Sequence, residues 1–428
     1  DRVLVKPNAV LDRHALGLDL YAIVTHPSVL RAVLDYVHLA QAGEGEITIA
    51  DAPQFNCDFE HYRAVTRIDA LPEFYERHTG RKVAIHDLRR LTAQNDSESG
   101  IVRSDSRRTH DGDPLGYRIV DLGASSAFAS LPGCDRIYGA DYDRTFASRA
   151  HQGGRHEYCL ANSVLAADVL LSVPKMKTHG KVGVTLNLKG MVGLNGDKNY
   201  IPHYRVGTPE EGGDEYPSGL DPIRRGGRRL QRALIDRLLV GKEEPGEVLY
   251  RRAIQVKQMA GRWLRRTGLM SPPTEATTRL TSGEWIGNDT AWRMTADLVR
   301  IALFADAEGR THATPQRRFF SVVDGIVAGE GDGPLEPTPR ATGVIAAGFH
   351  PVAVDAVVAA LMGFAPESLP QLRQHIGSPP PLGLALDSIA VHGEREADLA
   401  WVRAHALPFE PPLGWRSSTS ARRGAAER

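Results

Sequence analysis

Short apolar runs alternate with longer segments whose apolar residues recur at helical spacing, and this alternation limits the folds open to the chain. Near the N-terminus, strand-like runs at residues 3–5, 47–50 and 82–85 are separated by helical patterns at 27–42 and 72–78. Strands that alternate with helices in this way are typical of parallel βαβ units. We therefore predict an α/β fold with a mostly parallel sheet flanked by helices. In such sheets, ligands gather at the carboxyl ends of the strands.

The same alternation returns near the C-terminus, after an interruption of different composition. The segment at 205–285 is first polar and rich in Gly and Pro, and then basic. We predict that residues 1–204 and 286–410 form one discontinuous α/β domain and that 205–285 is a basic, partly helical insertion. Residues 417–428 are rich in Ser, Arg and Ala, which predicts a disordered tail.

The basic part of the insertion combines a strong positive charge with a helical pattern. Residues 224–266 hold 13 Lys+Arg against four acids, a local net charge of +9. Apolar residues recur there at steps of three and four, which predicts a helix with one apolar stripe: Leu249, Ala253, Val256, Ala260 and Trp263. One interpretation is a contact with a protein partner or a membrane surface. The other is a solvated helical excursion that packs on the domain.

The charge total conceals an uneven distribution of lysine. The chain has 52 Lys+Arg and 52 Asp+Glu, so its formal net charge is zero and we expect no nucleic-acid partner. Arginine outnumbers lysine 43 to nine, yet five lysines lie within 24 residues: Lys175, Lys177, Lys181, Lys189 and Lys198. A lysine ammonium is compact and can lose its proton, whereas an arginine stays charged. This concentration indicates that ammonium chemistry matters in that segment.

The lysine-rich segment follows a buried strand predicted at 168–173. That strand runs into Pro-Lys-Met-Lys-Thr-His at 174–179, so the polar groups are expected at the carboxyl end of a strand. Crowded ammonium groups repel one another unless an anion compensates them, and crowding lowers a lysine pKa towards use as a base or nucleophile. We predict the catalytic residues Lys175, Lys177, His179 and Lys189. The predicted substrate-binding residues are Lys6, Asn8, Thr185 and Asn187.

A second polar group follows the strand predicted at 319–323. Asp324, Glu330 and Asp332 stand among four glycines in residues 324–334. Oxygen ligands of this kind suit Mg²⁺ or Ca²⁺, and Asp324, Glu330 and Asp355 would then be the metal ligands. The same acids could instead pair with the lysines, or they could belong to a tight acidic turn. The residues alone leave all three interpretations open.

The cysteines and the apolar segments indicate a cytoplasmic protein. Cys57, Cys134 and Cys159 match no spacing of a zinc or iron–sulfur ligand set and are expected as reduced thiols. No segment approaches the roughly 20 apolar residues that span a bilayer. No signal peptide is visible, but the chain opens at Asp1, so a removed targeting segment stays open.

Several of these motifs together resemble the family catalogued as domain of unknown function 362. The resemblance spans about residues 2–365 outside the basic insertion and rests on Lys6-Pro7-Asn8, Thr25-His26-Pro27, Asp51, the segments 173–179, 185–190 and 324–334, and His350 to Asp355. Many members carry ferredoxin-type cysteine clusters. This chain has none, so the resemblance implies no iron–sulfur cluster here, and it brings no general reaction with it.

We expect an enzyme that acts on a phosphate- or carboxylate-bearing small molecule through the lysine and histidine cluster. One alternative is a non-catalytic protein that binds an anion or a partner, with the basic insertion as the contact. The other is an enzyme that depends on a divalent cation.

Overall fold

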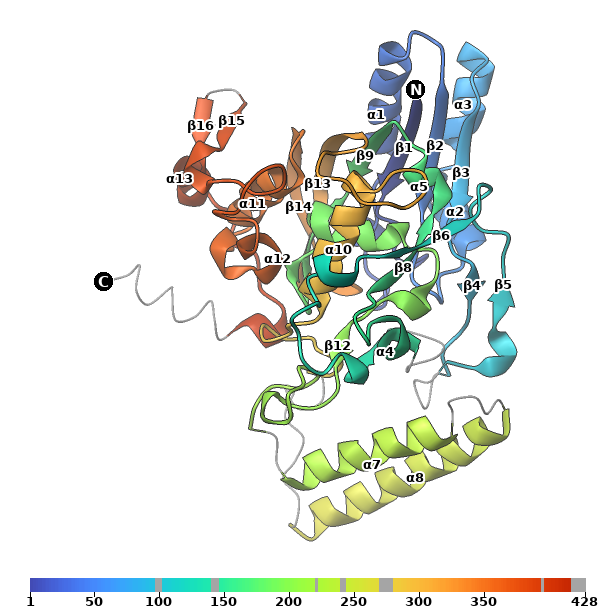
Figure 1. The fold of residues 1–428 in the computed structure, drawn as a ribbon, viewed down its shortest axis with the longest axis vertical. Helices are drawn as coiled ribbons and strands as arrows, with labels where there is room; N and C mark the ends of the chain where they lie inside the picture. Colours follow the sequence, from blue (N-terminus) through green and yellow to red (C-terminus); the bar gives the residue numbers. More distant parts are fainter. Residues whose placement is uncertain are drawn as a thin grey trace.

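The computed structural model describes residues 1–96, 102–139, 146–219, 222–238, 244–268, 280–393 and 396–416. The tail predicted at 417–428 lies outside the described residues. The centre of the fold is an eight-stranded sheet in the order β11-β10-β13-β9-β1-β2-β3, with β14 paired to β13 (Figure 1). Its strands are β1 (Arg2–Pro7), β2 (Glu46–Asp51), β3 (Val83–Asp87), β9 (Val169–Val173), β10 (Lys175–His179), β11 (Gly183–Val184), β13 (Arg318–Asp332) and β14 (Glu336–Gly348).

The sheet is mostly parallel, as the alternation of strands and helices predicted. All neighbours from β10 through β13, β9, β1 and β2 to β3 run parallel. Only β11 and β14, at one side, pair antiparallel with their neighbours in this sheet. The chain therefore has the predicted α/β fold.

Helices cover both faces of the sheet because side chains alternate between the faces along each strand. Val5 and Ile49 point to one face, into a core shared with α1 (Pro27–Ala40), α2 (Phe59–Thr66) and α3 (Ala70–Thr79). Leu4 and Leu170 point to the other face. There they pack in a second core with α5 (Asn162–Leu165), α6 (Leu186–Gly190), α10 (Ala291–Phe304), α11 (Pro351–Leu361) and α12 (Pro370–Arg373).

The segment 174–179, whose polar groups were predicted at the carboxyl end of a strand, forms most of a strand of its own. After Pro174 the chain continues as β10, all of whose residues are buried. The 15-residue strand β13 pairs with β9 through its first part and with β10 through Asp324 to Gly329. The segment 324–334, for which a tight acidic turn was one of three interpretations, is likewise mostly strand, because β13 extends to Asp332 and pairs with β14. The polar side chains of segment 174–179 are therefore carried by a strand of the sheet and not by a loop at its end.

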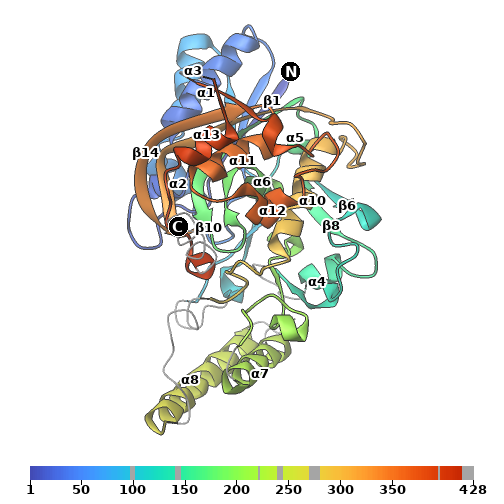
Figure 2. The same cartoon turned by 90° about the vertical axis from the view of Figure 1, so that its left-hand side faces the viewer.

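The remaining elements surround this body. Short two-stranded sheets pair β4 (Leu91–Thr92) with β5 (Arg108–Thr109), β6 (Tyr117–Asp121) with β8 (Glu157–Ala161), β7 (Ile137–Tyr138) with β12 (Tyr204–Arg205), and β15 (Ala390–His392) with β16 (Glu396–Asp398). Two more helices are α4 (Phe146–Ala150) and α13 (Leu399–Ala404). Within the insertion, α7 (Pro222–Leu238) and α8 (Glu244–Arg266) lie side by side and project from one end of the molecule (Figures 1 and 2).

Candidate functional site

A pocket of about 400 Å³ lies at the carboxyl ends of β1 and β2, beside β10 and α6. This is the edge at which parallel sheets place their ligands. The polar residues that line it include Lys6, Asn8, Asp51, Lys177, His179, Lys181, Thr185, Lys189, Lys198, His203 and Glu284. Five of the nine lysines in the chain therefore meet around one cavity.

Lys6 and Asp51 form a buried ion pair between the ends of neighbouring strands. Lys6 Nζ lies 2.9 Å from Asp51 Oδ1 and donates a hydrogen bond to the carbonyl of Pro7. Asp51 Oδ2 accepts the N–H of Ala9 at 2.8 Å. Gly193 passes directly over this pair, because a Cβ atom there would lie 1.9 Å from Asp51 Oδ1. A glycine is required here for the close approach of the backbone.

Two further lysines of the pocket are held by carbonyl oxygens. Lys177 Nζ donates to the carbonyls of Ile23 (2.9 Å) and Pro334 (3.1 Å). Burial, and then the charges of Lys189 and Lys175, place the pKa of Lys177 well below its ordinary value. Lys198 Nζ donates to Ala52 O at 2.7 Å, and burial lowers its pKa to about 8. These ammonium groups are fixed in place, but no carboxylate neutralises them at hydrogen-bonding distance in the described chain.

Lys189 stands apart from the other lysines because its amine meets no hydrogen-bond acceptor within the described residues. Burial, followed by repulsion from Lys198, Lys181 and Lys6, lowers its pKa to about 7. Asp355 holds the helix that carries Lys189, α6, because its carboxylate accepts the backbone N–H groups of Asn187 (2.9 Å) and Leu188 (2.8 Å). Near neutral pH, Lys189 is therefore divided between ammonium and free amine.

The pocket wall also presents a neutral histidine ring and two buried polar atoms that have no hydrogen-bond partner among the described residues. His179 Nδ1 accepts the N–H of Lys181 at 3.1 Å, so the neutral ring carries its proton on Nε2. Burial and the surrounding lysines hold the pKa of His179 well below its ordinary value. Thr185 Oγ1 and His203 Nδ1 are buried with no hydrogen-bond partner among the described residues. Buried polar groups are ordinarily paired, so these atoms indicate where a ligand could bind.

Two of the residues predicted for this site lie away from the pocket. Lys175 is fully buried, and its Nζ pairs with Asp324 Oδ2 at 2.8 Å. Asn187 Nδ2 donates to Asp355 Oδ1, and Asn187 Oδ1 accepts from Ser321 Oγ, both at 2.8 Å. Both residues hold neighbouring elements together. By contrast, the structure brings six predicted residues to the pocket: Lys6, Asn8, Lys177, His179, Thr185 and Lys189.

The predicted metal ligands do not come together. Asp324 binds Lys175, Glu330 Oε2 lies 2.7 Å from Arg340 Nη1, and Asp355 accepts from the start of α6. Across the described ranges, no group of three or more His, Cys, Asp or Glu side chains is arranged to hold a metal ion. For Asp324, the interpretation that the structure supports is the one in which an acid pairs with a lysine.

Some pocket residues were not among the predicted site residues. Lys181 and Lys198 belong to the dense lysine segment, and Asp51 stands at a predicted strand end, so the sequence did contain a signal for them. His203 and Glu284 flank the insertion, 81 positions apart, and no local pattern connects them. Lys181 Nζ donates to Ser282 O and lies 3.8 Å from Glu284 Oε1, which closes this side of the pocket.

Comparison with known proteins gives one match. The model of a family described as "Domain of unknown function (DUF362)" matches residues 117–360, a range that includes Lys177, His179 and Lys189. No curated protein and no solved structure matches the chain. None of the helices in the described part of the chain is both long and apolar enough to cross a membrane.

Proposed function

The chain belongs to the DUF362 family, and on that premise we propose that its lysine-lined pocket binds and transforms an anionic small molecule. The observation that carries the proposal is the charge around one cavity. Among the residues that the structure describes, five lysines line it against two carboxylates, Asp51 and Glu284, a formal balance of +3. Taking ammonium groups out of water costs free energy unless opposite charge compensates them. A volume of about 400 Å³ suits a small molecule that carries phosphate or carboxylate groups.

In this proposal the fixed lysines hold the anion. Lys6, Lys177 and Lys198 are oriented by Asp51 or by backbone carbonyls before any ligand arrives. Pre-oriented donors lose little conformational freedom on binding and favour a developing negative charge. The Nε2–H of His179 and the hydroxyl of Thr185 can donate further hydrogen bonds to the same ligand.

Lys189 is the residue proposed to perform the chemistry. Its pKa of about 7 supplies a free amine near neutral pH, which suits either removal of a proton or attack on a carbonyl. His179 is less suited to accept a proton, because burial and nearby lysines depress its pKa further. We therefore propose Lys189 as the residue that transfers the proton or attacks the carbonyl, and His179, also predicted as catalytic, as a neutral hydrogen-bond donor.

The binding step is testable by calorimetry with defined anions. Phosphate, pyrophosphate and malate are titrated into the wild type, Lys189→Met, Lys177→Met and Lys82→Met; Lys82 is exposed and lies outside the pocket. We expect Lys177→Met to weaken binding of the best anion about tenfold or more, which corresponds to the loss of one charge-assisted hydrogen bond. Lys82→Met should bind as the wild type does. Equal affinity of all four proteins for every probe would contradict an anion site in this pocket.

The chemical step needs a substrate, which mass spectrometry of molecules that co-purify with the protein can identify. We expect the wild type to convert that molecule and Lys189→Met to bind it without conversion. Reduction with borohydride during turnover distinguishes the two roles, because only a carbonyl attacked by Lys189 would be trapped as a stable adduct on the protein. Full turnover by Lys189→Met would refute the assignment of Lys189.

A further inference from the structure

The two helices of the insertion share a small apolar core that uses one side of α8. Tyr250 is buried there and packs against Ile254 of the same helix and against Leu234 and Leu238 of α7. Gln231 Nε2 also donates to Tyr250 Oη at 3.0 Å. This side of α8 is therefore occupied by its neighbour.

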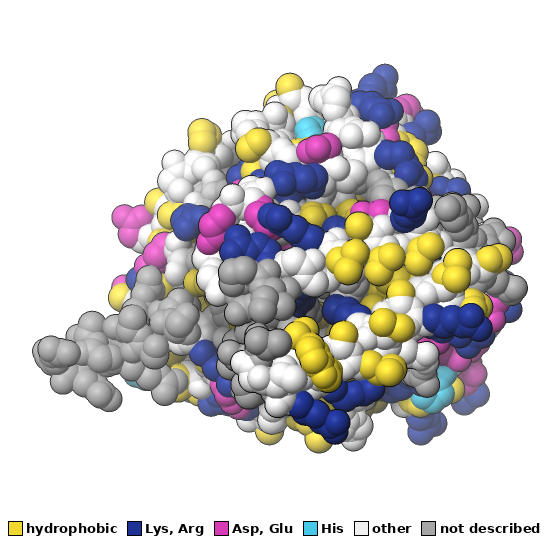
Figure 3. Space-filling view, turned by 90° about the horizontal axis from the view of Figure 1, so that it is seen from below, with side chains coloured by type: hydrophobic (Ala, Val, Ile, Leu, Met, Phe, Trp, Pro, Cys, Tyr) yellow, Lys and Arg dark blue, Asp and Glu magenta, His cyan; other side chains and the backbone are white. Residues whose placement is uncertain are grey.

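The opposite side of α8 exposes a row of large apolar side chains, here called the outer stripe. Its members are Leu249 (53% exposed), Val256 (64%), Met259 (61%) and Trp263 (60%). They recur at steps of three, four and seven residues, so they share one face of a helix and extend along roughly 20 Å of its length. Figure 3, which views the end of the molecule that carries α7 and α8, shows apolar side chains gathered in a band with Lys and Arg around it.

Basic side chains accompany the outer stripe. Arg252 and Arg266 lie within the stripe at the same helical spacing, Arg262 borders it, and all three are exposed. Arginines placed in this way can lay their aliphatic stems along an apolar surface while the charged ends reach outwards. The whole segment 224–266 carries a net charge of +9.

We propose that the outer stripe docks onto the surface of an anionic lipid bilayer, with α8 lying in the plane of the interface. An interfacial helix combines apolar side chains, which enter the boundary between headgroups and acyl chains, with Lys and Arg on its polar sides. Trp263 is of the type that prefers this boundary. Basic residues near an anionic leaflet add electrostatic attraction to it. Charge also argues against a second copy of the chain as the partner of the outer stripe, because a symmetric dimer would bring two copies of segment 224–266, each of net charge +9, face to face.

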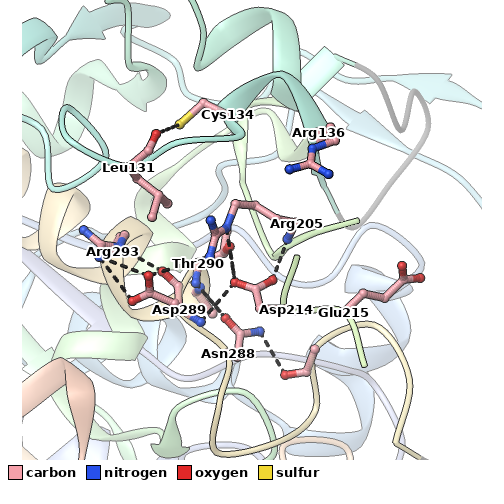
Figure 4. Close-up of polar contacts among 12 residues, drawn as sticks. Leu131, Cys134, Arg136, Arg205, Asp214, Glu215, Asn288, Asp289, Thr290 and Arg293 are labelled. Carbon is pink, nitrogen blue, oxygen red and sulfur yellow. Dashed lines mark hydrogen bonds and ion pairs between the residues drawn. The ribbon is translucent and has the colours of Figure 1, made fainter. Parts of the chain in front are cut away.

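Contacts between α7 and the rest of the molecule give this docking a direction, because Arg232 of α7 pairs with Glu215, and Tyr138 Oη donates to Asp236 of α7. Asp214 accepts the backbone N–H groups of Arg205 and Asp289 and the hydroxyl of Thr290, at 2.6, 3.0 and 2.6 Å (Figure 4). The pocket residues Tyr204 and Glu284 stand at the two ends of the insertion. A docked α8 would therefore hold this side of the pocket towards the membrane. The proposal does not depend on the reaction proposed for the pocket.

Co-sedimentation of the full chain with vesicles tests the proposal. The vesicles contain phosphatidylcholine alone or phosphatidylcholine with 30% phosphatidylglycerol, a composition chosen as the probe. The variants are Val256→Glu with Met259→Glu, and Arg252→Gln with Arg262→Gln and Arg266→Gln. The matched control is Tyr36→Glu with Leu39→Glu on α1, whose side chains are 76% and 71% exposed and have the same i, i+3 spacing. Circular dichroism checks that each variant keeps its helices.

The wild type should sediment with the anionic vesicles and not with the neutral ones, and 0.5 M salt should reduce the bound fraction. Both sets of α8 substitutions should weaken binding to anionic vesicles at least tenfold, and the α1 control should leave it unchanged. The proposal is overturned if the wild type does not bind anionic vesicles, or if the glutamate variant of α8 binds as the wild type does. It is also overturned if those glutamates only dissociate an oligomer or release a protein partner, with vesicle binding unchanged.

Discussion

Replacement of Lys189 by methionine should stabilise the protein at neutral pH, although it removes a residue from the candidate site. Methionine keeps the length and the apolar character of the lysine stem and removes the charge. In the wild type, folding places the Lys189 ammonium beside Lys198, Lys181 and Lys6. The folded state therefore resists its protonation, and the wild type carries a free-energy cost that Lys189→Met lacks.

The size and the sign of this cost follow from the pKa of Lys189. Its pKa falls from 10.5 to about 7, and at about 1.4 kcal/mol for each pKa unit the cost approaches about 5 kcal/mol below pH 7. Between pH 7 and 10.5 the unfolded chain binds more protons at this site than the folded chain, so wild-type stability rises with pH there. At pH 9 the remaining cost is about 2 kcal/mol. The advantage of Lys189→Met should therefore shrink by about 2–3 kcal/mol between pH 6 and pH 9.

Urea unfolding of wild type, Lys189→Met and Lys82→Met at pH 6, 7.5 and 9 measures these differences in buffers without multivalent anions. The comparison between proteins is needed because the pKa of Asp355 is raised from 3.8 to about 7, so its contribution to stability falls between those two pH values in each protein and still changes between pH 6 and 7.5. Lys82→Met, an exposed substitution, should change stability little at any pH. The reasoning is refuted if Lys189→Met is no more stable than the wild type at pH 6, or if its advantage does not change with pH.

Three further predictions follow from the same geometry. Anion binding at pH 8 should take up about one proton, because the negative charge of the ligand raises the low pKa values of Lys189 and Lys198. Calorimetry in two buffers of different ionisation enthalpy measures the uptake, and binding enthalpies that do not depend on the buffer would contradict it. Lys175→Met should lower the free energy of unfolding by about 3–5 kcal/mol, since it leaves the Asp324 carboxylate buried without its partner. Adding Asp324→Asn should restore part of that loss in the same unfolding assay, and an unaffected single variant would argue against the pair. Gly193→Ala should cost about 1–3 kcal/mol and weaken anion binding, because its Cβ would strike Asp51, whereas Gly226→Ala in open space on α7 should not destabilise the protein.

The sheet and much of the pocket were predictable because their signals are local. Strand and helix periods predicted the parallel sheet, and the carboxyl ends of its strands located Lys6 and Asn8. The density of lysine in residues 175–198 located Lys177 and Lys189 before their contacts were known. These predictions needed no knowledge of which distant segments meet.

The errors arose where long-range pairing decides the environment. Residues 174–179 are polar enough to suggest a loop, but β13 extends past Ser321 and provides a partner strand for them. That pairing places Asp324 beside Lys175 and removes both from the pocket. The register of β10 on β13 also shifts between Lys175 and Lys177, so the two lysines have different surroundings. Neither a strand partner nor an irregular register can be read from one stretch of sequence.

The two ends of the insertion lie close together, so the helices between them could be replaced by protein engineering. Gly283 N donates to Glu215 O at 2.9 Å, and Trp285 Nε1 donates to Asp214 O at 2.8 Å. The segment that leads into α7 and the segment that follows α8 are therefore hydrogen-bonded to each other near the α/β domain. Backbones closed on each other in this way tolerate replacement of what lies between them. The helical hairpin could therefore be exchanged for a short linker, an affinity tag or a fluorescent domain while the lysine pocket keeps its walls. Such grafts would allow the α/β domain and the two insertion helices to be studied separately. The same arrangement would have allowed the two parts to vary independently in evolution.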